Sequence, residues 1–194
     1  NRDEEGYSIP IDLALAFHTD AGRRLIDSVV GTLAIYTTIS DEKNNYANGD
    51  NRIEGRYLSD FIQTQIVSDI SKLNERDWQR RGIRDRAYFE ARVPEVPTML
   101  LELHSHQNLE DMEFALHPQF KFDAARAIYK GILKFISTKS SESLKVQPLP
   151  IKDLAVLPSK KGAIISWQPV EDPLEPSAKP ESYILYSRVD NGGF

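Results

Sequence analysis

Apolar and polar positions along the first two-thirds of the chain alternate between strand-like and helix-like patterns. Compact apolar or β-branched runs at 11–18, 32–39 and 96–103 predict buried strands, and 87–93 is a further strand candidate. Pro97 lies near the start of the last buried run, where its missing N–H disturbs strand pairing least.

Two longer segments carry the periodicity of helices that bury one face. Apolar residues recur every three to five positions across 56–74. Asn108 is suited to cap a short helix that runs to Leu116, and Pro118 suits the first position of a second helix. Because strands and helices alternate, we expect an α/β fold with a mostly parallel sheet and helices on both faces.

The composition changes near residue 140. Seven of the eleven prolines lie between 148 and 180, and the stretch 137–143 is polar and rich in serine. Such stretches are typical of linkers and loops. We therefore expect one domain over 1–140, a linker over 141–147 and part of a second domain over 148–194.

Charge and composition exclude several classes of function. Lys and Arg number 24 against 29 Asp and Glu in the 194 residues, so no general basic surface exists for nucleic-acid binding. The apolar runs are too short to span a membrane, and the polar, acidic start shows no signal peptide. With no cysteine, the chain has neither disulfides nor thiol chemistry nor thiolate zinc ligands.

His18 is the first candidate for a functional residue. It ends the predicted strand 11–18, and ligands of open α/β sheets bind outside the carboxyl ends of strands. Its imidazole can therefore hold a metal or a substrate. The competing interpretation is a hydrogen-bonded histidine at the edge of a strand.

Glu102 interrupts the apolar run 99–103 near the end of another predicted strand. Burial of a carboxylate costs several kcal/mol unless it is paired or bound to a metal, so Glu102 is either a site residue or half of a structural ion pair. His104 and His106 follow at alternate positions, on the same side as Glu102 if the strand continues. Such a cluster has the chemistry of metal ligands.

Arginines cluster at 80–86 in an otherwise acidic domain. Arg81 and its neighbours can bind a carboxylate of a substrate, pair with a nearby carboxylate of the chain, or form a solvated face. The sequence contains no glycine-rich phosphate loop, no Gly-x-Ser-x-Gly and no His-Glu-x-x-His. The absence of His-Glu-x-x-His excludes the helical zinc-peptidase arrangement.

Several segments resemble the zinc-dependent N-acetylmuramoyl-L-alanine amidases in order and spacing. They are RGIRD at 81–85, VPTMLLEL at 96–103, QN at 107–108, LHPQF at 116–120 and AARAIYKGI at 124–132. AFHTDA at 16–21 resembles the Ser-x-His-x-Asn-Ala segment of that family, and 31–36 resembles the strand after it. The resemblance covers about 8 to 137.

The resemblance implies a zinc hydrolase that cleaves the amide between N-acetylmuramic acid and L-alanine in peptidoglycan. His18 matches a zinc ligand of the family, and Glu102 matches its catalytic glutamate, which takes a proton from zinc-bound water. The family's other two zinc ligands precede His18, and no histidine occurs in residues 1–17. We therefore expect the N-terminal part of the catalytic domain to be missing and the 194-residue chain by itself to lack amidase activity. A cell-wall substrate implies a periplasmic or extracellular protein.

The sequence also departs from the family. Asp20 replaces the usual Asn, and His104 with Ser105 replaces a common Gly-Phe pair, so Asp20, His104, His106 and Arg81 are possible additional site residues. These departures give some weight to an alternative, a non-catalytic module that binds peptidoglycan or another glycan. A metallopeptidase with another peptide substrate is the second alternative.

The tail resembles the first strands of a fibronectin type III domain. The matching segments are 151–156, 162–169 and 182–188, and Trp167 and Tyr183 are the expected core aromatics. A complete domain of that class has seven strands in two sheets.

Overall fold

The structure, a computed structural model, describes residues 11–21, 28–140 and 145–188. The chain divides into two compact units, Asn1–Glu142 and Ser143–Phe194. No helix in the described ranges is both long enough and apolar enough to cross a bilayer.

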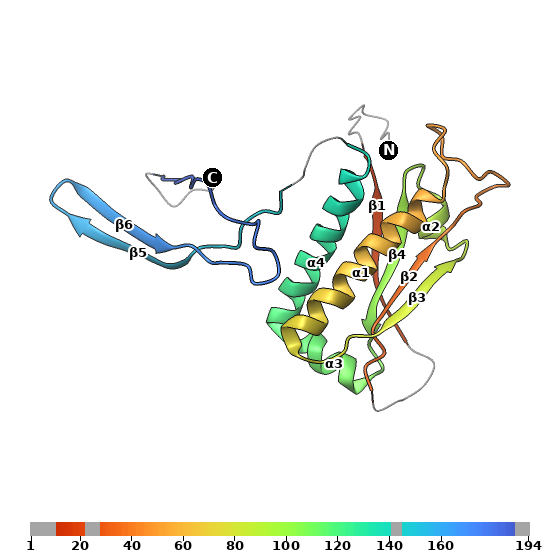
Figure 1. Cartoon of the computed structure of the whole chain (residues 1–194), viewed down its shortest axis with the longest axis horizontal. Helices are drawn as coiled ribbons and strands as arrows, with labels where there is room; N and C mark the ends of the chain where they lie inside the picture. The colour runs from red at the N-terminus through yellow and green to blue at the C-terminus, as the bar shows by residue number, and fades with distance from the viewer. Residues whose placement is uncertain (1–10, 22–27, 141–144, 189–194) are drawn as a thin grey trace. The chain divides into compact units, whose positions relative to one another are not determined.

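The first unit is a four-stranded sheet packed against helices (Figure 1). The sheet order is β1-β4-β2-β3. Its strands are β1 (Ala14–Asp20), β2 (Thr32–Tyr36), β3 (Arg80–Asp85) and β4 (Thr98–Ser105). The helices are α1 (Glu54–Asn74), the single turn α2 (Phe89–Arg92), α3 (Leu109–Leu116) and α4 (Pro118–Ser137).

The sheet is mixed, which corrects the expectation of a mostly parallel one. β1 pairs with β4 and β2 with β3 in parallel, whereas β2 and β4 are antiparallel. Parallel neighbours need a long crossover, which α1 supplies between β2 and β3. Between β3 and β4 the chain forms only the single turn α2, and it reverses direction there.

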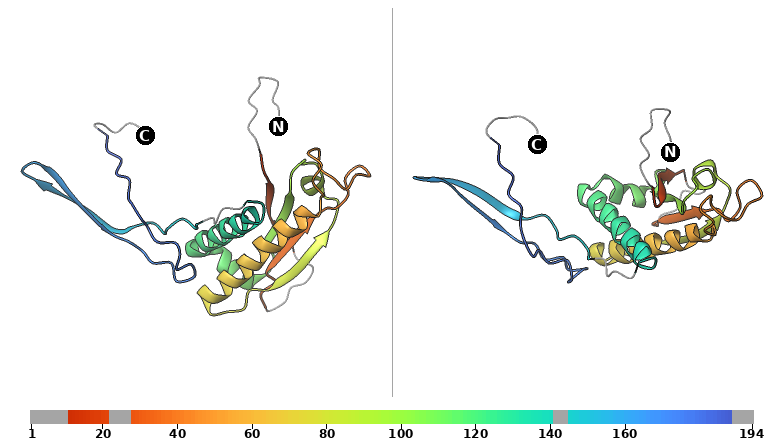
Figure 2. Two further views of the ribbon diagram at one scale, coloured as in Figure 1. Left: turned by 45° about the horizontal axis from the view of Figure 1, so that its top comes forward. Right: turned by 90° about the horizontal axis from the view of Figure 1, so that it is seen from above.

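The two long helices pack side by side on one face of the sheet, rather than on both faces as expected (Figure 2). Their shared core includes Met99, Leu101 and Leu103 of β4, Ile62 of α1 and Ala127 of α4. The helices approach closely at Gly131, where an added Cβ would lie 2.6 Å from the Ile62 Cα. The opposite face has a smaller cluster of Leu33, Ile35 and Leu100 with Ala16 against it. We call this second face the open face.

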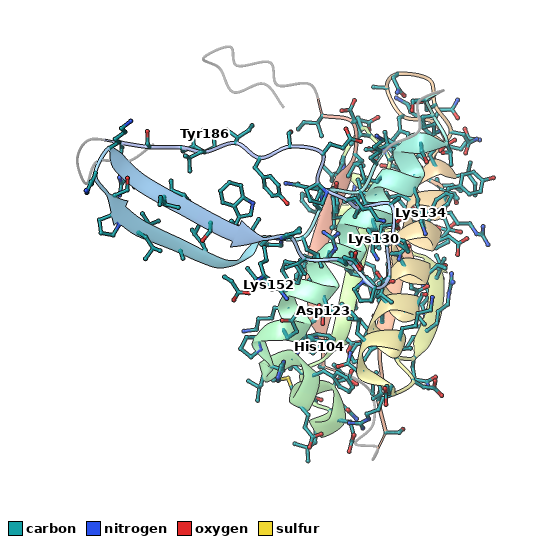
Figure 3. The ribbon with its side chains drawn as sticks, turned by 60° about the vertical axis from the view of Figure 1, so that its left-hand side comes forward. His104, Asp123, Lys130, Lys134, Lys152 and Tyr186 are labelled. Carbon is teal, nitrogen blue, oxygen red and sulfur yellow. The ribbon has the colours of Figure 1, made fainter. Side chains whose placement is uncertain are left out.

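A buried ion pair joins the long helices. Lys130 Nζ of α4 lies 2.6 Å from Asp69 Oδ2 of α1, and both side chains are at least 95% buried. Gln65 donates to the other oxygen of Asp69 at 2.8 Å, and Lys134 donates to Gln65 at 2.6 Å (Figure 3). These polar groups are therefore satisfied inside an otherwise apolar interface.

Other predicted elements are partly confirmed. The helix boundaries at Asn108 and Pro118 are correct: Asn108 caps α3 by accepting from Asp111 N at 2.8 Å, and Pro118 opens α4. The strand expected at 87–93 is wrong, because this stretch contains α2, and the strand lies earlier, at Arg80–Asp85.

The second unit contains a two-stranded antiparallel hairpin of β5 (Lys152–Ser159) and β6 (Gly162–Gln168). Trp167 contacts Tyr183 edge-to-face with ring centroids 5.1 Å apart. The third expected strand is wrong, since 182–188 forms no strand. The fibronectin type III-like domain stays a prediction.

Candidate active site

The candidate site lies where β1 and β4 end side by side. The two strands are parallel, and His18 is the register partner of Glu102. Side chains alternate along a strand, so His18 and Glu102 follow Ala16 and Leu100 onto the open face. The sheet thus brings together two residues that are 84 positions apart in sequence. Two parallel neighbouring strands do this because their carboxyl ends lie at the same edge of the sheet.

Glu102 is half-buried, and its Oε2 atom is shielded from solvent without a hydrogen-bond partner. Burial raises the pKa of Glu102 above its ordinary value, and the negative charge of Asp20 raises it further. The electrostatic influence of His18, Arg81 and His106 lowers the pKa of Glu102 and so opposes this change. A carboxyl group whose pKa is raised by burial and held back by neighbouring groups is suited both to accept and to return a proton.

Asp20 and Arg81 form an ion pair beside Glu102. Arg81 Nη2 lies 2.5 Å from Asp20 Oδ2, and both side chains are about four-fifths buried. Of the interpretations considered for Arg81, the structure therefore shows pairing with a carboxylate of the chain itself.

The side chain of Arg81 extends from β3 across the sheet to Asp20 of β1, and β3 has a β-bulge at this point. The register with β2 shifts between the pairs Thr32↔Arg80 and Ala34↔Ile83, and Gly82 adopts φ +107°. Gln63 of α1 fixes the bulge because its side-chain amide donates to Gly82 O and to Thr32 O, each at 2.8 Å.

The histidines separate into two environments. His18 Nε2 lies 3.9 Å from Glu90 Oε1, and His106 Nδ1 lies 3.3 Å from Thr19 Oγ1. His106 also donates its backbone N–H to Asp20 O at 2.9 Å, which holds the loop after β4 against the end of β1.

His104 instead packs edge-to-face against Phe120 in the core on the helix side, with ring centroids 6.5 Å apart (Figure 3). Burial lowers the pKa of His104. The expectation that His104 lies on the same side of the sheet as Glu102 is wrong, because the register of β1 and β4 shifts between His18 and Asp20. The structure therefore brings Glu102, His18, Asp20, Arg81 and His106 together, and His104 lies apart from them.

Zinc does not fit the donor set of this part of the chain. Among the described residues, no group of three or more His, Asp or Glu side chains is arranged to hold a metal ion. A protein zinc site needs at least three ligands, and the site offers His18 with Glu90 as its nearest carboxylate.

Asp111 is a site-supporting residue that the sequence analysis missed. Its fully buried carboxylate accepts N–H groups from Val30 at 2.7 Å, Gly31 at 3.2 Å and Ser105 at 2.8 Å. It thereby ties the start of β2 to the end of β4, three residues after Glu102. The spacing Asn108-x-x-Asp111 resembles a capping box, and this pattern could have drawn attention to Asp111. In a capping box the Asp111 carboxylate would bind the backbone N–H of Asn108, whereas here it binds the amides of Val30, Gly31 and Ser105.

The fold is similar to that of solved N-acetylmuramoyl-L-alanine amidases. An N-acetylmuramoyl-L-alanine amidase from Clostridium difficile 630 superposes with a TM-score of 0.52 at 17% identity, over 66% of this chain and 60% of its own. An N-acetylmuramyl-L-alanine amidase from Mycobacterium smegmatis gives 0.50 at 15% identity, over 65% and 54%. This chain thus spans little more than half of either structure. No protein-family model matches the sequence. No curated protein matches it.

Proposed function

We propose that this protein is a peptidoglycan amidase, a hydrolase that cleaves the amide between N-acetylmuramic acid and L-alanine. One observation carries the proposal: half-buried Glu102 faces His18 in register at the ends of two parallel strands. The amidase-like fold and the sequence resemblance around Glu102 support it.

In the proposed reaction Glu102 is the catalytic residue. It accepts a proton from the attacking water as the oxygen of that water bonds to the amide carbon. It then gives the proton to the nitrogen as the carbon–nitrogen bond breaks, which releases a free amine and a carboxylic acid. The burial that raises the pKa of Glu102 favours this return of the proton.

The other residues of the cluster set the charge around Glu102 rather than react. Arg81 offsets the charge of Asp20, and without it two unpaired carboxylates would lie side by side. Zinc binding through His18 in the intact protein stays a prediction, and neither proton transfer is assigned to a metal. A cell-wall substrate places the protein, as part of the same proposal, in the periplasm or outside the cell.

The test compares Glu102→Gln with Glu113→Gln, a matched change at an exposed position on α3. Purified cell walls are incubated with each protein, and released peptides are identified by mass spectrometry. We expect the intact wild-type protein and its Glu113→Gln variant to release intact stem peptides with a free L-alanine amine, and intact Glu102→Gln to release none.

The same experiment separates the alternatives. Cell-wall binding without peptide release by the wild type would favour the non-catalytic binding module. Products cut at another peptide bond would favour the metallopeptidase. Release by Glu102→Gln at the wild-type rate would contradict the role of Glu102.

A further inference from the structure

The segment 86–95, here called the rim segment, borders the open face at the candidate site. Glu90 of α2 places a carboxylate oxygen 3.9 Å from His18 Nε2, which fixes the position of the segment beside the cluster. Next to Glu90 along the chain, Tyr88 and Phe89 are 53% and 65% exposed. Two large aromatic side chains are thus exposed on the segment whose Glu90 reaches the site.

This exposure does not come from a loose loop, because buried groups anchor the rim segment. Arg52, only 1% exposed, donates to Arg92 O at 3.1 Å and pairs with Glu95 at 2.8 Å. Ala91 is buried, and Arg86 N donates to Tyr36 O at 2.8 Å.

Charged groups accompany the rings. The guanidinium of Arg92 lies over the Phe89 ring, 5.7 Å from its centroid, and Glu90 lies on the same helical turn. A rigid aromatic surface with hydrogen-bonding groups beside it matches a sugar, which has apolar ring faces and hydroxyl edges. Exposed apolar groups grouped beside a site mark a binding surface.

We propose that the rim segment binds the glycan strand of the substrate, with pyranose rings stacked on Tyr88 and Phe89. Glu90 and Arg92 then hydrogen-bond to the sugar hydroxyls. This inference rests on the proposed function, since in that reaction the glycan is the polymer attached to the cleaved amide. Stacking outside the catalytic cluster contributes to binding of long strands and leaves the chemistry at Glu102 unchanged.

The test uses Tyr88→Ala and Phe89→Ala, with Phe122→Ala as the control. Phe122 is 43% exposed on α4, which packs against the helix side of the sheet. Affinity for peptidoglycan strands freed of peptides is measured by isothermal titration calorimetry, so the result does not depend on cleavage. We expect each rim variant to lose about tenfold in affinity, a size typical of removing one aromatic contact, and Phe122→Ala to bind like the wild type.

Cleavage of a short soluble muramyl peptide is measured on Phe122→Ala and should stay at the wild-type rate, because Phe122 lies outside both the site and the rim segment. A wild type that does not bind free strands, rim variants that bind normally, or an equal loss in Phe122→Ala would overturn the glycan assignment. The glycan assignment would also be overturned if the rim variants lost affinity only for strands that still carry peptides, because the rim segment would then bind the peptide. Failure of the wild type to cleave any amide would instead contradict the proposed function and leave the strand-binding result interpretable.

Discussion

Arg81 and Asp20 form an ion pair between the two edge strands of the sheet, β3 and β1. Their contact crosses the open face beside Glu102, at the end where β1 and β4 finish. The two charges of the pair therefore act in opposite directions on the pKa of Glu102. Each partner can be removed separately, with opposite consequences for Glu102.

The first prediction concerns the titration of Glu102. Asp20→Asn removes a negative charge that raises the pKa of Glu102, so we expect this pKa to fall. Arg81→Gln removes an opposing positive charge, so the pKa should rise. Carbon-13 NMR of the carboxyl groups follows both shifts. Shifts of the same sign in the two variants would show that the pair does not act through charge.

The second prediction concerns stability and pH. Because the pKa of Glu102 is raised in the folded state, the folded protein binds more protons than the unfolded chain just above the ordinary value of 4.5. The contribution of Glu102 to stability is therefore fully present below that value and is lost as pH rises through the folded pKa. Urea unfolding of Glu102→Gln and wild type across this range should show the variant gaining relative stability as pH increases. A difference that is constant with pH would contradict the raised pKa.

The third prediction tests the ion pair between the long helices. Lys130→Met leaves Asp69 buried with its charge unpaired, and we expect a loss of about 3–5 kcal/mol in the free energy of unfolding. Lys121→Met, the same change at an exposed position of α4, should have little effect. The free energy of unfolding is measured by urea denaturation. Equal losses in the two variants would show that the buried ion pair does not stabilise the protein more than an exposed lysine does.

The fourth prediction concerns Asp111. Asp111→Ala leaves the N–H groups of Val30, Gly31 and Ser105 without their carboxylate partner. Each buried donor left unsatisfied costs about 1–3 kcal/mol. We expect faster hydrogen exchange at the Ser105 amide and reduced activity of Glu102 nearby, with unchanged exchange in the middle of α1. Slow exchange at Ser105 in the variant would contradict the role of Asp111.

The fifth prediction concerns zinc. His18 is the sole residue of the chain that matches a zinc ligand of the resembled family, so we expect the 194-residue chain to bind zinc weakly or not at all. Equilibrium dialysis measures the stoichiometry. One tightly bound zinc that is lost in His18→Ala would contradict this expectation.

Much of the helical fold could be predicted because its signals are local. The cap at Asn108, the proline at the start of α4 and the apolar periodicity of α1 each act within a few residues. The strand β3 was missed because four of its six residues are charged. Charged side chains are typical of edge strands, where they discourage pairing with other chains.

The arrangement of the site depends on contacts that are distant in sequence. Glu102 stood out as a carboxylate in an apolar strand, but its register with His18 follows from the sheet order. The pairing of Arg81 with Asp20 further requires the bulge at Gly82 and the amide of Gln63. No local pattern encodes that combination, and the position of His104 depends on a register shift that alternation does not foresee.

The central place of β4 has a consequence for how the protein is made. β4 pairs with β1 on one side and β2 on the other, although it is the last of these strands to leave the ribosome. The segment β2–α1–β3 contains its own parallel pair and can form first during synthesis. β1 must wait about 80 residues for its partner, with its edge exposed, and loop closure of that length slows folding. A pause in translation before residue 98 would therefore prolong the period in which β1 can pair with another nascent chain.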